Sequence, residues 1–165
     1  MPSSELIDLI QRIDSAYRQW TGGGLPGPQA ATADQHFLWL HQQAPYSLLA
    51  HGGGVDPVFI YANHCAQQCF GYSFDEFIAL PSRLSASPVD RAERQQLLDK
   101  TTRQGIAQGY QGLRVDKFGN AFTIYDCAVW QIPGGGQGAL FWPQPKRRPG
   151  WFNHRRTCTV QNDKG

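Results

Sequence analysis

The chain has 165 residues, of which 41% are hydrophobic and 17% are charged. This length and composition predict one globular domain with short extensions and exclude a largely disordered protein. No apolar run approaches the roughly 18 residues that cross a bilayer, and Glu5 and Asp8 in the first apolar stretch argue against a secretory signal. We therefore expect a cytoplasmic protein with no membrane partner, whose four cysteines are reduced thiols.

The formal net charge of +2 is unevenly distributed along the chain. Residues 143–165 carry six basic residues and one acidic residue, a net charge of +5, which leaves −3 for the rest. A mildly acidic body is not typical of a nucleic-acid-binding domain, so only the basic tail would touch nucleic acid. We expect this tail to be flexible.

The N-terminal segment predicts an amphipathic helix followed by a linker. Apolar residues recur at the spacing of one helix face over residues 4–20, and Ser4 is the expected N-cap. The Gly- and Pro-rich residues that follow end this helix. We assign residues 1–30 to the helix and linker. The main domain, residues 31–142, would begin with a second helix over 33–43.

Short β-rich runs follow, and then helices. Residues 46–51 and 58–63 predict two strands joined by a turn. Residues 63–69 can form one or two helical turns, and a helix is expected over 73–80. Residues 87–105 predict a longer helix, because Pro lies near its start, acidic residues come early and basic residues come late.

The strongest strand signal is a hairpin over residues 110–132. A two-residue loop at Gly119–Asn120 would place Leu113 opposite Asp126, with both side chains on one face. Residues 138–142 predict a fifth strand. This order of elements predicts an α+β fold: a five-stranded antiparallel sheet with helices on one face, preceded by the N-terminal amphipathic helix.

Four segments of the chain resemble the MEKHLA domain, a PAS-like family that includes small stand-alone bacterial proteins. The matching segments are residues 15–22, 50–63, 80–94 and 108–130. The resemblance extends over roughly residues 6–142. It implies the PAS fold and a sensor-like module, but it implies no particular ligand or reaction.

One PAS subclass, the flavin-binding light-oxygen-voltage photosensors, resembles Asn-Cys-Arg-Phe-Leu-Gln where this chain reads PSRLSA over residues 81–86. Arg83 matches, but Ser82 replaces the adduct-forming cysteine and cannot supply a thiolate. The sequence therefore argues against adduct photochemistry, and the loss of the amide side chains weakens the case for flavin. No motif supports haem, so the cofactor is left open.

His64, Cys65 and Cys69 lie close together but do not form a tetrahedral zinc set. The two thiols share one helix face, whereas the histidine points elsewhere. A disulfide across one helical turn is strained. We interpret both cysteines as small buried hydrophobes in the wall of a pocket, and we predict no metal site.

Asp126 is a candidate ligand anchor, together with Arg83, if it faces inward. The alternatives are a structural pair with Arg114 or an outward position after a register slip of one residue. A catalytic set would need a nucleophile near His51, and no Gly-x-Ser-x-Gly motif exists here.

We predict a non-enzymatic sensory or regulatory module that binds a small molecule between sheet and helices, forms a homodimer or binds a partner protein, or does both. Two alternatives stay open: a small enzyme using Asp126, His51 and Arg83, and a structural dimer without a cavity. The N-terminal helix would cover the sheet or a second copy. The candidate pocket residues are Phe59, Tyr61, Cys65, Cys69, Phe77, Arg83, Leu113, Phe122, Ile124, Asp126 and Trp130.

Overall fold

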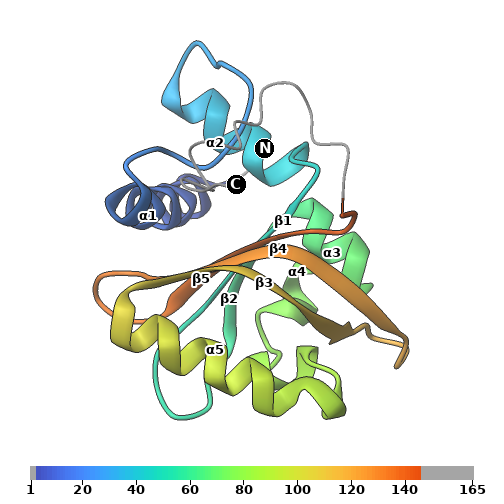
Figure 1. The fold of residues 1–165 in the computed structure, drawn as a ribbon. Helices are drawn as coiled ribbons and strands as arrows, with labels where there is room; N and C mark the ends of the chain where they lie inside the picture. The colour runs from blue at the N-terminus through green and yellow to red at the C-terminus, as the bar shows by residue number, and fades with distance from the viewer. Residues whose placement is uncertain (1–2, 146–165) are drawn as a thin grey trace.

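A five-stranded antiparallel sheet forms the centre of the computed structural model, which describes residues 3–145 (Figure 1). Its strands are β1 (Ser47–His51), β2 (Phe59–Ala62), β3 (Ile106–Val115), β4 (Ala121–Gln131) and β5 (Gln137–Trp142). They lie in the order β2-β1-β5-β4-β3, so the last strand pairs with the first. The predicted α+β fold is confirmed.

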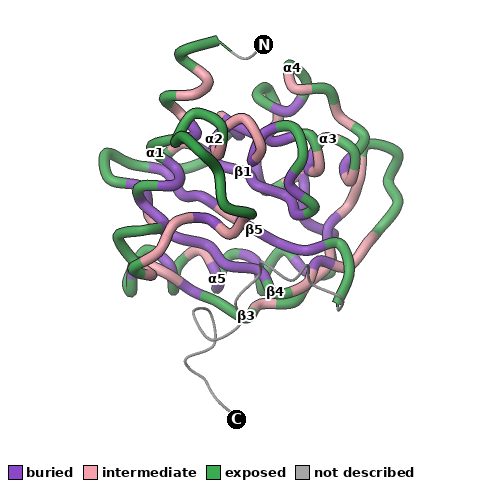
Figure 2. Tube along the Cα trace, turned by 90° about the horizontal axis from the view of Figure 1, so that it is seen from above, coloured by how far each residue is buried: buried purple, intermediate pink, exposed green. Residues whose placement is uncertain are grey.

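Helices cover both faces of this sheet (Figure 1). They are α1 (Ser4–Thr21), α2 (Ala33–Gln42), α3 (His64–Phe70), α4 (Phe74–Phe77) and α5 (Arg91–Gln104), with 3-10 turns at Ser82–Ser85 and Pro88–Asp90. Side chains alternate along each strand, so Leu48 packs with α1 and α2, whereas Leu49 packs with α3 to α5. Both faces of the central strands β1 and β5 are therefore buried (Figure 2).

The apolar stripe of α1 packs on the sheet of its own chain. Trp130 on β4 donates its indole N–H to the carbonyl of Ile13 over 3.2 Å, and the Tyr17 ring meets the Trp130 ring edge-on at 4.8 Å. Ile10 and Ile13 are fully buried there. Of the two covers expected for this stripe, the sheet is the one observed. The N-cap is Ser3 and not Ser4.

Two predicted helices are shorter than expected. Residues 74–77 form one turn with a capping box between Ser73 and Glu76, and Leu80 then bonds back to Phe77. The long helix begins at Arg91 because residues 88–90 form a 3-10 turn. Asp90 makes no cap, since its carboxylate accepts from Leu113 and Tyr110 on β3.

The predicted register of the β3–β4 hairpin is wrong, because its loop is longer than two residues. The Asp116 carboxylate accepts the backbone N–H groups of Phe118 and Asn120, and Gly119 adopts a φ of 85°. These contacts make a loop with a glycine in the left-handed region. Leu113 therefore lies opposite Thr123 and not Asp126.

Asn63 follows directly after β2 and is fully buried, and its side chain hydrogen-bonds to four backbone groups. Its side-chain oxygen accepts from Leu48 N and from Ala66 N, each at 3.0 Å, and so caps α3. Its amide nitrogen donates to the carbonyls of Leu40 and Tyr46 at 2.9 and 3.1 Å. One side chain thus fixes the end of α2, the start of β1 and the start of α3.

Replacing Asn63 with Ala should lower the free energy of unfolding by about 2–4 kcal/mol, because it removes an N-cap and leaves buried carbonyls and N–H groups unpaired. Urea titration followed by tryptophan fluorescence measures this change. The control is Gln68→Ala, an exposed position on the same helix, which should change stability by less than about 0.5 kcal/mol. Equal effects of the two substitutions would contradict the role given to Asn63.

Candidate functional site

The inner cavity, between the sheet and α5, has a volume of about 40 Å³. Apolar side chains such as Phe59, Leu97 and Phe141 line it, and Arg94 and Arg114 line it as well. Ligand pockets usually exceed about 300 Å³. The inner cavity is therefore too small for an organic ligand of ordinary size.

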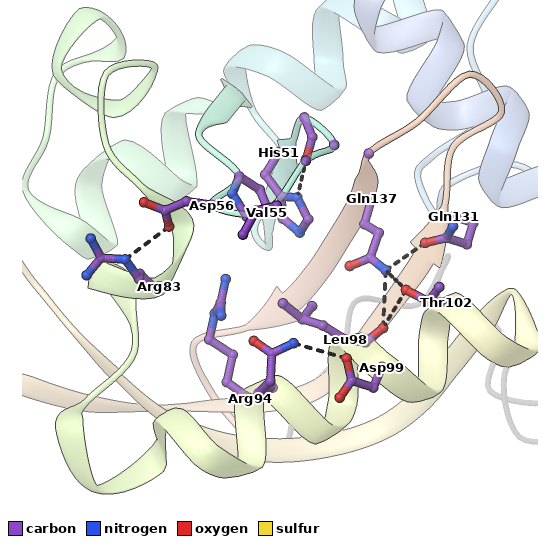
Figure 3. A pocket seen from close by; sticks show the side chains of 16 residues that line it. His51, Val55, Asp56, Arg83, Arg94, Leu98, Asp99, Thr102, Gln131 and Gln137 are labelled. Atoms are coloured by element: carbon purple, nitrogen blue, oxygen red, sulfur yellow. Dashed lines mark hydrogen bonds and ion pairs between the residues drawn. The ribbon is translucent and has the colours of Figure 1, made fainter.

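The outer cavity opens beside it and has a volume of about 320 Å³ (Figure 3). The loop of residues 52–57 forms one wall, α5 forms another, and the start of β5 closes the base. Four side chains line both cavities and form the boundary between them: His51, Arg94, Leu98 and Gln137.

Three charged side chains at this boundary and behind it are more than nine-tenths buried: Arg94, Arg114 and Asp90. Arg114 lies 3.6 Å from the Asp90 carboxylate, which also accepts from Tyr110 and Leu113. Arg94 donates to the Ser82 hydroxyl, and no carboxylate among residues 3–145 lies within ion-pair distance of it. The two buried arginines thus have only one buried carboxylate beside them, and it pairs with Arg114.

Arg94 keeps its positive charge in this setting. Burial, and then the neighbouring charge of Arg114, lower the pKa of Arg94 to about 10. It is therefore protonated at pH 7. A buried charge without a counter-ion is costly, so the boundary between the cavities favours an anion.

His51 and Gln137 present two further polar atoms that lack partners in the described part of the chain. These atoms are His51 Nε2 and Gln137 Oε1. His51 Nδ1 lies 2.9 Å from the Gly52 carbonyl, an acceptor, so Nδ1 carries the proton and Nε2 presents a lone pair. Burial, helped by the charge of Arg94, lowers the pKa of His51. Contacts of a protonated ring with the Gly52 carbonyl and the Gln137 side chain would raise it but do not outweigh burial, so the ring is neutral at pH 7.

The orientation of the Gln137 amide is fixed by its nitrogen. That nitrogen has three acceptors in reach: Leu98 O at 3.3 Å, Thr102 Oγ1 at 3.2 Å and Gln131 Oε1 at 2.6 Å. Oε1 is therefore the atom without a partner. Together, the boundary offers one cationic donor and two neutral acceptors (Figure 3).

The structure divides the predicted pocket residues among several places. Phe59, Phe77 and Ile124 are buried in the core between the sheet and α3 to α5, and Phe122 packs against that core. Leu113 is half-buried on β3. Tyr61 and Trp130 belong to the core under α1 and α2, on the opposite face of the sheet. Strict alternation would put Tyr61 on the face of Phe59, but an irregularity in the pairing of β2 with β1, and another in β4, reverses the faces.

Arg83 lines the outer cavity, as does its partner Asp56, 3.0 Å away. Asp126 does not join them. It is exposed on an irregular stretch of β4 and has a φ of 50°. Of the positions left open for Asp126, the outward one is observed, since the bulge turns this residue toward solvent.

Cys65 and Cys69 are half-buried thiols on α3, each 3.8 Å from the Ser47 hydroxyl. Hydrogen bonding from Cys65 lowers the pKa of Cys69 to about 7, and the same contact, with burial, raises the pKa of Cys65. Neither cysteine lines the outer or the inner cavity. Within residues 3–145, no three His, Cys, Asp or Glu side chains gather as a metal site would require.

Two residues of the boundary, Arg94 and Gln137, were not predicted from the sequence. A signal for Arg94 existed: it lies four residues after Asp90 and three before Leu97, and all three are buried. A charge within the buried stripe of a helix is unusual and could have been noticed. Gln137 follows a Gly-rich turn and has no comparable signal.

Flavin does not fit the inner cavity. The volume is about 40 Å³, and the Arg94 guanidinium bonds to Ser82, at the position of the adduct-forming cysteine of photosensors. A three-ring cofactor would need these buried side chains to move.

Several solved structures share this fold at low sequence identity. The PAS domain of a protein from Colwellia psychrerythraea has a TM-score of 0.58 at 17% identity, with 68% of this chain and 97% of that chain covered. A domain of a sensory box sensor histidine kinase/response regulator from Geobacter sulfurreducens has a TM-score of 0.55 at 16% identity, with 66% and 91% covered. A LOV protein from Rhodobacter sphaeroides has a TM-score of 0.52 at 11% identity, with 62% and 61% covered. The fold is that of a PAS domain.

The family follows from the sequence comparison. The MEKHLA domain model matches residues 7–139, which is most of the chain. The chain belongs to the MEKHLA domain family, as its resemblance predicted. No curated protein sequence matches it significantly. Of the helices in the described range, none is both long and apolar enough to cross a membrane.

The buried Asp90–Arg114 pair should make stability depend on acid pH. Burial alone raises the pKa of Asp90, but hydrogen bonds from Leu113 and Tyr110, with the charge of Arg114, outweigh it and hold the pKa below its ordinary value of 3.8. A lowered carboxyl pKa stabilises the fold above pH 3.8, and this stabilisation is lost as the pH falls through the folded value.

Asp90→Asn should therefore be less stable than wild type at pH 6, and the difference should shrink as the pH falls below about 3.8. Urea unfolding at several pH values measures it. Asp34→Asn, at an exposed position of α2, is the control. A difference for Asp90→Asn that stays constant with pH would show that its carboxylate is not linked to folding.

Proposed function

We propose that the protein is a sensory or regulatory module that binds a small polar molecule in the outer cavity. The observation that carries this proposal is the set of buried polar groups at the base of the cavity. Arg94 has no counter-ion in the described residues, and His51 Nε2 and Gln137 Oε1 have no hydrogen-bond partner there. Folded proteins rarely leave such groups unpaired without a functional reason.

A route for a signal leads from this site to α1. Gln137 Nε2 donates to the side chain of Gln131 at 2.6 Å, and the Gln131 backbone carbonyl accepts the indole N–H of Trp20 at 2.9 Å. A ligand that moves Gln137 would change the end of α1. Since Trp20 is 39% exposed, this end is open to a second copy or a partner protein.

Of the rival functions, neither has an observation that favours it. The alternative of a small enzyme needs Asp126, His51 and Arg83 together, but Asp126 does not line the outer cavity. A structural dimer without a cavity is not favoured either, since the outer cavity is of ligand size. A homodimer and a cytoplasmic location remain part of the proposal. The basic residues of the tail lie within residues 146–165, outside the described residues, so its contact with nucleic acid stays a prediction.

The test is nuclear magnetic resonance of the ¹⁵N-labelled protein with mixtures of carboxylic acids, amino acids, sugar alcohols and amides. At least one mixture should shift the resonances of residues 51–56 and 94–102, the two segments that supply most of the cavity lining. Gln95→Trp should abolish the shifts, because Gln95 is an exposed residue of the cavity wall and a large ring at this position would fill the cavity.

Gln96→Trp is the matched control, because Gln96 is exposed on the same helix but does not line the cavity. It should retain the shifts at the wild-type concentration dependence. If no mixture perturbs these resonances in the wild-type protein, or if both tryptophan variants respond alike, the proposed function is wrong.

A further inference from the structure

We infer that the ligand of the outer cavity is a free α-amino acid, with its carboxylate on Arg94 and its ammonium group between His51 Nε2 and Gln137 Oε1. This inference rests on the proposed function, because it names the ligand of the same site. It follows from three features of the site: the positive charge of Arg94, the two acceptors at the boundary and the charges of the cavity wall.

Arg94 supplies the site for a carboxylate. Its guanidinium is anchored by the Ser82 hydroxyl, it lines the outer cavity, and Arg114 already takes the buried carboxylate of Asp90. The other arginine of the cavity, Arg83, is half-exposed and paired with Asp56. A guanidinium fork matches the geometry of a carboxylate, so Arg94 is the free anion-binding group of the described cavity wall.

One ligand group can serve both acceptors at once only if it has more than one hydrogen to donate. His51 Nε2 presents a lone pair because Nδ1–H faces the Gly52 carbonyl. Gln137 Oε1 is an acceptor because its nitrogen is held by Leu98, Thr102 and Gln131. A carboxylate has no hydrogen to donate, and a hydroxyl has one. An ammonium group has three, so it can serve both acceptors at once.

The charges of the cavity wall favour a zwitterion over a dianion. Arg83 and Arg94 carry two positive charges, and Asp56 and Asp99 carry two negative charges, so the wall is neutral as a whole. Asp99 lies on α5 and accepts from Gln95. A dianion such as phosphate would meet Asp56 and Asp99 with only Arg94 unpaired, whereas a zwitterion keeps the total charge unchanged.

The first measurement uses the unmodified protein. Thermal-shift and calorimetric titrations with the standard L-amino acids should show at least one that binds. For the tightest binder, three matched analogues are then compared: its amide, its deaminated acid and its α-hydroxy acid. The amide and the deaminated acid should each bind at least about 30-fold more weakly, since each leaves a buried group unpaired. The hydroxy acid should fall between them and the amino acid.

The second measurement uses two variants, Arg94→Gln and Arg103→Gln. Arg94→Gln should lose at least about 30-fold in affinity, while its stability without amino acid equals or exceeds that of wild type because a lone buried charge is removed. Arg103→Gln, the matched control, should bind within about threefold of wild type, because Arg103 is exposed on the same helix and does not line the outer cavity. If Arg94→Gln does not fold, the analogue series on the wild-type protein still tests whether the site binds the carboxylate and the ammonium group.

The outcomes separate this inference from the proposed function. If the deaminated or hydroxy acid binds as tightly as the amino acid, the ammonium contacts are wrong. If no amino acid binds but another compound shifts residues 51–56 and 94–102, the inference fails and the proposed function stands. If nothing shifts those residues, both fail.

Discussion

The fold depends on a single buried amide. Asn63 hydrogen-bonds to the end of α2, the start of β1 and the start of α3, so it sets where three elements meet. Donors and acceptors must all be paired in a dry interior, and one amide offers both kinds at one point. By fixing β1 at its first residues, Asn63 also fixes the path of that strand to His51, which lines the candidate site.

The second constraint is electrostatic. Within residues 3–145, Arg94 and Arg114 are both buried on the α5 side of the sheet, and only one buried carboxylate, Asp90, lies beside them. The Asp90–Arg114 pair ties the start of α5 to β3 and so contributes to the fold. Arg94 is left at the boundary of a cavity, where its charge costs stability unless an anion arrives. The proposed binding site and a local instability therefore share the same cause, as is common where proteins bind ligands.

The sequence predicted the elements of the fold well and their contacts less well. The sheet, α1, α2 and the long helix follow from apolar periodicity and from turn residues. The hairpin register failed because the Asp116 side chain builds a longer loop, which a Gly-Asn pattern does not reveal. Tyr61 and Trp130 are among the predicted pocket residues, although their side chains lie on the α1–α2 side of the sheet. Alternation would place Tyr61 with Phe59 and Trp130 with Ile124, but irregular pairing in β2 and β4 reverses the faces, and the sequence does not reveal it.

The sequence by itself determined the family, the α+β fold and the amphipathic character of the N-terminal helix, since these depend on local propensity, periodicity and recognisable segments. Only the tertiary structure decided that His51, Arg94 and Gln137 meet at one boundary, because β1, α5 and β5 bring them together from distant parts of the chain. It also decided that Arg94 lacks a counter-ion in the described chain, since whether a charge is paired depends on distances in space and not on composition.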